Sequence, residues 1–161
     1  MAEKAQKAIP EGMHTISIHL WFNGNCNEAI EFYQKAFGAE LVAPVVPTPD
    51  GDGVLHAMLR LGDSPLLMAD SWPGSWESGP KQNTTASMWI YVEDCDKLFN
   101  RAVEAGCQSK VSMNDAFWGD RFGKVQDPFG HVWSIATHKW VYSSEEMQRK
   151  QKEWEDKLRE N

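Results

Sequence analysis

The chain has 161 residues, of which 42% are hydrophobic, which is enough to build the core of one ordinary domain or of two small modules. Its formal net charge of -7 argues against nucleic acid or an anionic membrane surface as a partner, because both attract clusters of lysine and arginine. The polar start and the lack of any apolar run of ~20 residues argue against a secretory leader and a membrane span, so we expect a cytoplasmic protein.

After an N-terminal extension over residues 1–14, residues 17–40 predict a strand followed by a helix. The apolar residues of the helical part recur at spacings of three and four, which gives the helix one apolar face. Gly38 comes directly after this pattern and suits the first position beyond a helix. Three strands are predicted within 40–48, 53–63 and 64–72, separated by turns. Residues 15–72 are therefore expected to form one βαβββ module.

Residues 85–140 repeat this order after a linker at 73–84 that is rich in glycine, proline, serine and asparagine. The segment SMWIYVEDCDKLFNRAVEAGCQ (87–108) aligns with SIHLWFNGNCNEAIEFYQKAFGAE (17–40), and Gly106 corresponds to Gly38. Three strands are predicted within 110–119, 120–127 and 131–138, and Asp127 with Pro128 starts a tight turn before the last one. The sequence thus predicts a second βαβββ module.

Residues 141–161 predict a charged amphipathic helix, capped by Ser143 or Ser144. Met147, Trp154 and Leu158 form a narrow apolar stripe on it, which must dock on its own domain or on a partner subunit. The chain also has three cysteines without CxxC or zinc-site spacing, and we expect them to be reduced structural thiols.

Each module needs a helix to cover one face of its sheet, so the other two faces are expected to border a cleft. The segments FNGNCNEAIEFYQKAFGAE, HAMLRLGD and DRFGKVQDPFGHVWSIATH resemble the PhnB-like branch of the vicinal oxygen chelate superfamily. That superfamily includes glyoxalase I, fosfomycin-resistance proteins, bleomycin-resistance proteins and extradiol dioxygenases. The resemblance implies an α+β fold in which two βαβββ modules form a U-shaped mixed sheet around a ligand, often in a homodimer.

Metal-dependent members of the superfamily hold a divalent ion with His, Gln or Glu on the first strand of each module, on a middle strand, and with a Glu on the final strand. The resemblance places these positions on Ser17, Ser87, His56 and Ser134, with His19 on the same strand face as Ser17. Serine hydroxyls are poor ligands for a divalent ion, whereas imidazole and carboxylate are good ones. We therefore expect no cofactor, with a divalent metal at a displaced site near His19 and His56 as the open alternative.

Strand alternation adds further side chains to the faces that are expected to border the cleft. Trp133 and Ile135 alternate with Ser134 and should face the helix instead. Asp120 and Arg121 are predicted in the loop before the penultimate strand, where a structural turn with an ion pair is the alternative to a ligand contact. The predicted ligand-binding residues are Ser17, His19, Trp21, His56, Met58, Arg60, Ser87, Trp89, Trp118, Arg121, Ser134 and His138.

The predicted function is the binding of an apolar or aromatic small molecule in the cleft, as in bleomycin-resistance proteins, without the superfamily metal. An aromatic-lined cleft with a few polar groups is the usual form of a small-molecule site, and the chain has eight tryptophans to line it. The alternative is a metal-dependent lyase or isomerase of glyoxalase type, or an extradiol dioxygenase, and Ser134 in place of Glu speaks against it. No catalytic residue is assigned, and a homodimer is expected.

Overall fold

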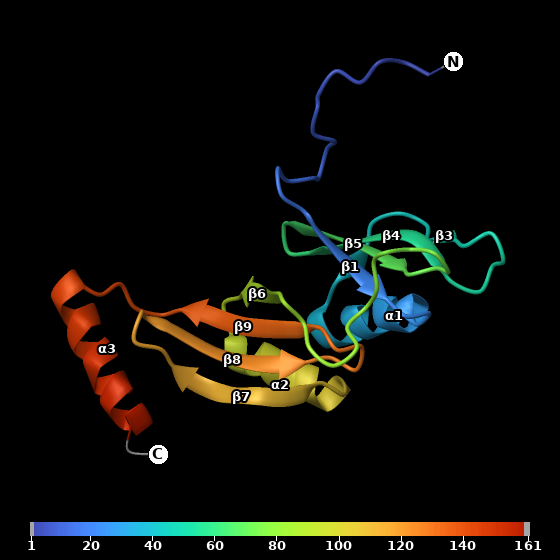
Figure 1. Ribbon diagram of the computed structural model, residues 1–161. Helices are drawn as coiled ribbons and strands as arrows, with labels where there is room; N and C mark the ends of the chain where they lie inside the picture. Colours follow the sequence, from blue (N-terminus) through green and yellow to red (C-terminus); the bar gives the residue numbers. More distant parts are fainter. Residues whose placement is uncertain (1, 160–161) are drawn as a thin grey trace. The chain divides into compact units, whose positions relative to one another are not determined.

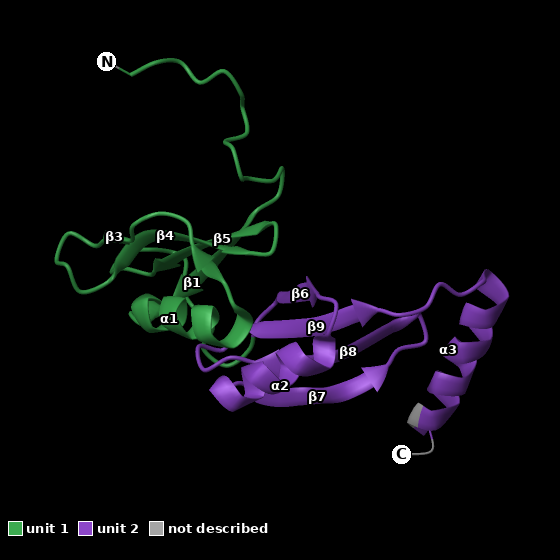
Figure 2. Cartoon of the chain, turned by 180° about the vertical axis from the view of Figure 1, so that it is seen from behind, with its two compact units in different colours: residues 1–83 green, residues 84–161 purple. Residues whose placement is uncertain are grey.

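The computed structural model describes residues 2–159 of the chain. It divides into two compact units, unit 1 over residues 1–83 and unit 2 over residues 84–161 (Figure 2). Each unit holds one βαβββ module, and unit 2 also holds the C-terminal helix (Figure 1). The predicted α+β class is confirmed, whereas the finer predicted boundaries at 15–72, 73–84, 85–140 and 141–161 stay predictions.

Unit 1 is a mixed sheet with one helix. Its elements are β1 (Ile18–Phe22), α1 (Cys26–Phe37), β2 (Glu40–Leu41), β3 (Val46–Pro47), β4 (Val54–Leu61) and β5 (Ser64–Asp70). The sheet order is β1-β5-β4-β2, with β3 also pairing β4, and β1 runs parallel to β5. The single strand predicted within 40–48 is thus divided into two short strands. Pro44 lies between them, and proline has no amide hydrogen to donate to a sheet.

Unit 2 follows the same order with a continuous second strand. Its elements are β6 (Ser87–Tyr91), α2 (Cys95–Ala105), β7 (Gln108–Asp115), β8 (Asp120–Gln126), β9 (Val132–His138) and α3 (Ser144–Arg159). The sheet order is β6-β9-β8-β7, and β6 runs parallel to β9. Met88, Trp133 and Ile135 are buried on the side of the sheet that α2 covers, as alternation predicted for the last two. The opposite side of this sheet carries the candidate site.

The helix ends agree with the sequence signals. Gly38 ends α1 in the left-handed conformation with φ at 72°. At the start of α3, Ser143 Oγ accepts from the Glu146 amide, and the Glu146 carboxylate accepts from the Ser143 amide, which is a capping box. The side chain of Leu158 lies outside what the structure describes, so the predicted stripe on α3 is traced only through Met147 and Trp154.

Two buried carboxylates hold turns in place and belong to the scaffold. Asp127 Oδ1 accepts from the amides of Phe129 and His131, both at 2.9 Å, and its Oδ2 accepts from Trp133 Nε1 at 2.8 Å. These bonds confirm the tight turn predicted before β9. In unit 1, Asp70 accepts from three backbone amides in the same manner.

All three cysteines are buried and free. Burial raises the thiol pKa of Cys26 and of Cys107 to about 12, and the neighbouring Asp70 and Asp127 carboxylates add to this effect. Such thiols stay protonated and unreactive near neutral pH, which agrees with the predicted structural role. Within residues 2–159, no helix is both long enough and apolar enough to cross a membrane.

Candidate functional site

The candidate site lies on the face of the unit 2 sheet that α2 does not cover. Alternation along β6 places Ser87, Trp89 and Tyr91 on this face. In the strand register, Trp89 lies opposite Ser134 of β9, and Ser134 lies opposite Lys124 of β8. Further along, His138 at the end of β9 pairs with the first residue of β8, Asp120. The sheet therefore brings side chains from three strands and from the loop before β8 onto one surface.

Four aromatic rings gather on this surface, and we call them the aromatic face: Trp89, Tyr91, Trp118 and Phe122. The Trp89 and Phe122 rings are stacked, with centroids 5.4 Å apart and planes inclined by 21°. The Trp118 ring lies 5.2 Å from Phe122 and 6.3 Å from Trp89. Trp89 nevertheless remains 39% exposed, so the cluster presents ring surface to solvent. Ring surfaces of this kind stack well on planar or cationic ligands.

A hydrogen-bond network centred on Asp120 borders the aromatic face. Asp120 is only 3% exposed, and its Oδ2 accepts from Tyr91 OH at 2.9 Å and from Trp118 Nε1 at 2.8 Å. Its Oδ1 lies 2.7 Å from His138 Nδ1. Burial opposes the charge of Asp120, but the hydrogen bonds from His138, Trp118 and Tyr91 outweigh this, and the pKa of Asp120 lies below its usual value. The carboxylate is thus kept ionised and fixed in direction.

The imidazole of His138 is the polar group that this network presents to solvent. Its side chain is 56% exposed, while its Nδ1 is held by Asp120. A carboxylate at Nδ1 fixes the tautomer in which Nδ1 carries the proton, so Nε2 is left as an acceptor. Burial and the bond to Asp120 raise the pKa of Tyr91, so its hydroxyl remains a donor to that carboxylate. The arrangement can therefore accept a proton or a hydrogen bond at Nε2.

The matching face of unit 1 carries His19, Trp21, His56, Met58 and Arg60, in line with the predicted alternation. The His19 ring lies 4.5 Å from the Trp21 ring, which in turn lies 5.8 Å from Trp72. Burial lowers the pKa of His19, repulsion from His56 adds to this, and Glu77 partly opposes it. Arg60 forms an exposed ion pair of 2.7 Å with Glu40 at the sheet edge. No carboxylate hydrogen bond to His19 or His56 is found within residues 2–159.

Three of the four positions where the resemblance places a metal ligand carry serines, whose hydroxyls are poor ligands for a divalent ion, whereas the fourth, His56, has a suitable side chain. Ser17 precedes β1, where its hydroxyl is engaged with the backbone of His14. Ser134 has no exposed surface, and its Oγ is the one buried side-chain nitrogen or oxygen without a hydrogen-bond partner among the described residues. No cluster of three or more His, Cys, Asp or Glu that suits a metal occurs in the described part of the chain. The serine hydroxyls thus do not provide a ligand set for a divalent ion at these positions.

Arg121 differs from the prediction. It belongs to β8 rather than to a loop, and alternation turns it away from Asp120 to the helix side of the sheet. There it forms ion pairs of 2.7 Å with Asp96 of α2 and of 3.3 Å with Asp115 of β7. Arg121 thus forms ion pairs with Asp96 and Asp115 from a strand rather than within a turn next to Asp120.

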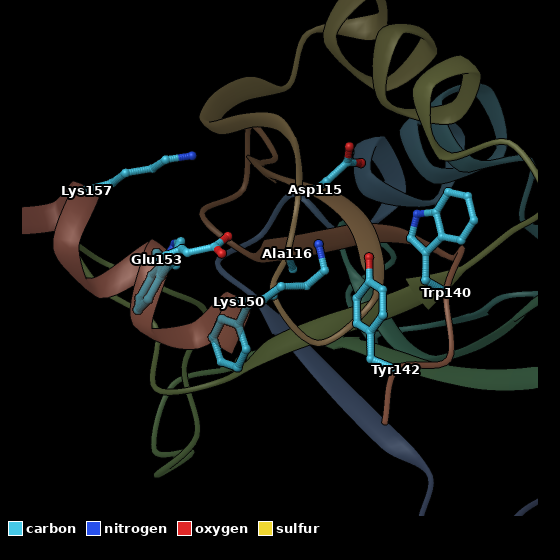
Figure 3. Close-up of a pocket in the computed structure, with 9 residues that line it drawn as sticks. Asp115, Ala116, Trp140, Tyr142, Lys150, Glu153 and Lys157 are labelled. Atoms are coloured by element: carbon cyan, nitrogen blue, oxygen red, sulfur yellow. The ribbon is translucent and has the colours of Figure 1, made fainter. Parts of the chain in front are cut away.

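A separate hollow of about 400 Å³ lies between α3 and the segments around Phe117 and Trp140. Figure 3 shows Lys150, Glu153 and Lys157 extending from α3 opposite Trp140 and Tyr142. The Lys150 ammonium lies 4.8 Å from the centre of the Tyr142 ring, and the Trp154 ring lies 5.6 Å from Phe117. Lysines and carboxylates alternate along this hollow, so it offers no concentrated charge or fixed polar group for a ligand.

Of the predicted residues, the structure brings Trp89, Trp118, Ser134 and His138 together on one face of unit 2. Three members of the site were missing from the predicted set, namely Tyr91, Asp120 and Phe122. Tyr91 lies two residues after Trp89, and Phe122 lies two residues after Asp120. The same period of two that selected Trp89 therefore places both rings on this face. The burial of Asp120 had no sequence signal of its own.

The chain is thus a protein with two βαβββ modules, each with one helix on one face of its sheet. The family model of the Glyoxalase/Bleomycin resistance protein/Dioxygenase superfamily matches residues 15–135. The chain belongs to this superfamily, which confirms the resemblance to vicinal oxygen chelate proteins.

Individual relatives agree with this assignment. The uncharacterized protein Rv0887c of Mycobacterium tuberculosis is 39% identical over 112 residues, which cover 66% of this chain and 65% of that relative, slightly less than two thirds of its length. Protein YjdN of Escherichia coli is 29% identical over 138 residues, covering 74% of this chain and 92% of that one. Among solved structures, protein PA1353 from Pseudomonas aeruginosa is 29% identical with a TM-score of 0.64, covering 78% of this chain and 98% of that one.

Proposed function

We propose that this protein binds small aromatic molecules against the aromatic face of unit 2. The observation that carries the proposal is the exposed ring cluster, in which Trp89, Trp118 and Phe122 lie within 5.2 to 6.3 Å of one another on an uncovered sheet face. Stacking on such rings contributes about 0.5–1.5 kcal/mol per pair beyond the area that it buries. A rigid ring platform therefore favours planar ligands over flexible aliphatic ones.

The polar groups beside the rings support the same proposal. Ligand sites combine apolar walls with a few fixed polar groups that set the orientation of the ligand. Here Asp120 holds Tyr91, Trp118 and His138 in one network, so the rings and the imidazole keep a fixed relation to one another. Membership of a superfamily that includes bleomycin-resistance proteins also agrees with small-molecule binding.

Equilibrium dialysis tests the proposal, with 4-nitroanisole as a simple planar probe and bleomycin as a large one. Replacing Trp89 by alanine removes the central ring, and we expect about a tenfold loss of affinity, which corresponds to about 1.4 kcal/mol. The control is Trp76→Ala, because Trp76 is 92% exposed and lies in unit 1. Equal affinity in the wild type and in Trp89→Ala would refute the assignment to the aromatic face.

The proposal needs no metal ion, which separates it from the metal-dependent alternative. The serines at the superfamily metal positions are the observation behind this part of the proposal. Binding of 4-nitroanisole is expected to be unchanged after dialysis against a chelator. If elemental analysis finds about one ion per chain, and binding is lost with the chelator and restored by the ion, the metal-dependent alternative is favoured.

A further inference from the structure

One carboxylate connects the imidazole of His138 to the rings of the aromatic face. Asp120 uses Oδ1 for His138 and Oδ2 for both Tyr91 and Trp118, so the carboxylate has bonds on both oxygens. A carboxylate held on both oxygens cannot turn away from the imidazole without breaking bonds while it is buried. His138 is thereby fixed by the same carboxylate that holds Tyr91 and Trp118, with its Nε2 directed away from Asp120.

Nε2 of His138 has no bonding partner within residues 2–159. An imidazole whose Nδ1 proton is donated to a carboxylate presents the lone pair of Nε2 outward, where it can accept a proton. Asp70, by contrast, accepts from backbone amides. The imidazole of His138 therefore has a carboxylate partner that fixes its direction.

We propose that His138, positioned by Asp120, accepts the proton of an acidic aryl hydroxyl, so that the site binds phenols as their phenolate anions. This inference rests on the proposed function, because the aromatic face must hold the ring of the ligand. In the step, the O–H bond of the phenol breaks, its electron pair stays on the oxygen, and an N–H bond forms at Nε2. No oxidant, metal or second substrate takes part.

The charged groups around His138 favour this transfer. On the same sheet face, Asp120 supplies the negative charge that stabilises the imidazolium, and Lys124 lies further along β8, where its positive charge favours an anionic ligand. Tyr91 remains a hydrogen-bond donor to Asp120 and does not compete for the proton. The imidazolium and the phenolate then form an ion pair at Nε2, on the side of the imidazole away from Asp120.

The remaining charges near this end of the sheet act elsewhere. Arg121 is bound to Asp96 and Asp115 on the helix side, and Lys139 acts on the same Asp96 carboxylate. Lys150, Glu153 and Lys157 of α3 line the separate hollow. Asp120 is thus the charge that faces His138 directly.

The chemistry of the two parts selects the ligand class. The rings require a planar group, and transfer to an imidazole requires a proton that is not far less acidic than imidazolium, whose ordinary pKa is near 6.5. Phenols with electron-withdrawing substituents meet both requirements, whereas aliphatic alcohols meet neither.

Two probes that differ by one methyl group separate proton transfer from ring binding. 4-Nitrophenol has the acidic hydroxyl and absorbs at a longer wavelength as its phenolate, whereas 4-nitroanisole has the same ring without that proton. At the midpoint of free 4-nitrophenol, half of the free probe is phenolate, and most of an ordinary imidazole is still neutral and able to accept a proton. With the protein in excess, we expect about nine tenths of the bound probe to show the phenolate absorption at this pH, which is about a tenfold shift in the ratio of phenolate to phenol.

In His138→Gln, the bound 4-nitrophenol is expected to return to the phenolate fraction of the free probe, while 4-nitroanisole, which has no proton to transfer, still binds. Asp120→Asn is expected to act in the same direction, and His14→Gln, which changes an exposed histidine of unit 1, is expected to change nothing. An unchanged phenolate fraction in His138→Gln overturns the inference and leaves the proposed function standing. Failure of both probes to bind the wild type overturns the proposed function, and this inference with it.

Discussion

Ser134 shows how one residue separates this chain from metal-binding relatives. It occupies the position where those relatives are expected to carry a Glu, yet its side chain has no exposed surface and its Oγ lacks a hydrogen-bond partner. A carboxylate buried there would need hydrogen-bond partners or an opposite charge, and the residues opposite Ser134 in the strand register are Trp89 and Lys124. The small, neutral serine avoids this burial of charge.

We expect Ser134→Ala to raise the free energy of unfolding by about 1 kcal/mol, because it removes a buried hydroxyl that has no hydrogen bond. Urea unfolding followed by tryptophan fluorescence measures the change. Ser87→Ala is the matched control, since Ser87 is exposed on the neighbouring strand, and its effect should stay within about 0.5 kcal/mol. A loss of stability in Ser134→Ala would mean that the hydroxyl has a partner after all.

His19 of unit 1 provides a second residue-level prediction, based on its lowered pKa. Burial is the main cause, and His56 and Glu77 act in opposite directions. His56→Gln should therefore raise the pKa of His19, and Glu77→Gln should lower it further, as measured by the pH dependence of its ring NMR signals. His14→Gln is the control and should leave it unchanged.

The same shift links His19 to stability. Because its folded pKa lies below the unfolded value near 6.5, the unfolded chain takes up the proton first as the pH falls. The His19 contribution to stability is therefore fully present above this value and is lost as the pH drops through it toward the folded pKa. A His19→Gln variant should lose less stability than the wild type between pH values on either side of this range.

At the level of elements, the loop between β7 and β8 sets the geometry of the candidate site, since it carries Trp118 and leads into Asp120. Gly119 holds this loop against the chain after β9, because its carbonyl accepts from the amides of Lys139 and Trp140 at 2.9 and 3.0 Å. Its φ of +105° is one that side chains rarely adopt, and a Cβ there would meet the carbonyl of Trp140.

Gly119→Ala is therefore expected to lower the free energy of unfolding by about 1–3 kcal/mol and to weaken the binding of 4-nitroanisole, because the loop with Trp118 must move. Thermal unfolding and equilibrium dialysis measure the two effects. Gly74→Ala is the control, since Gly74 has a positive φ but open space around its Cα, so it shows backbone strain without the clash. Equal losses in both variants would contradict the role of this close contact.

The periodic elements could be predicted from the sequence, whereas contacts between distant elements could not. The period of two identified Trp89, Ser134 and His138 as residues of one face, and the glycines and serines at the helix ends marked where α1 and α3 stop or start. The bond between Asp120 and His138 joins residues 18 positions apart through the register of β8 and β9, which only the folded sheet defines. Arg121 was misplaced because β8 begins at Asp120, so the strand already includes both residues that were assigned to the loop before it.

For the whole molecule, α3 is the element with the least support from its own unit. The Trp154 ring of α3 contacts the Phe117 ring. Trp140 and Val141, which precede the helix, are 57% and 88% exposed. Exposed apolar side chains that lie close together mark surfaces that bind other proteins. We propose that this region contributes to a homodimer of the chain, which many superfamily members form.

Light scattering of the full chain is expected to give twice the mass of one chain, and a variant truncated after Val141 is expected to dissociate at concentrations where the full chain stays dimeric. The physical reason is that removal of α3 takes away the Trp154 ring and leaves less apolar surface to bury. A variant without residues 2–14 is the control, because the residues of that segment are exposed except for Met13, and its dimer should persist. An unchanged dimer after truncation would exclude α3 from the interface and place the contact on the two modules.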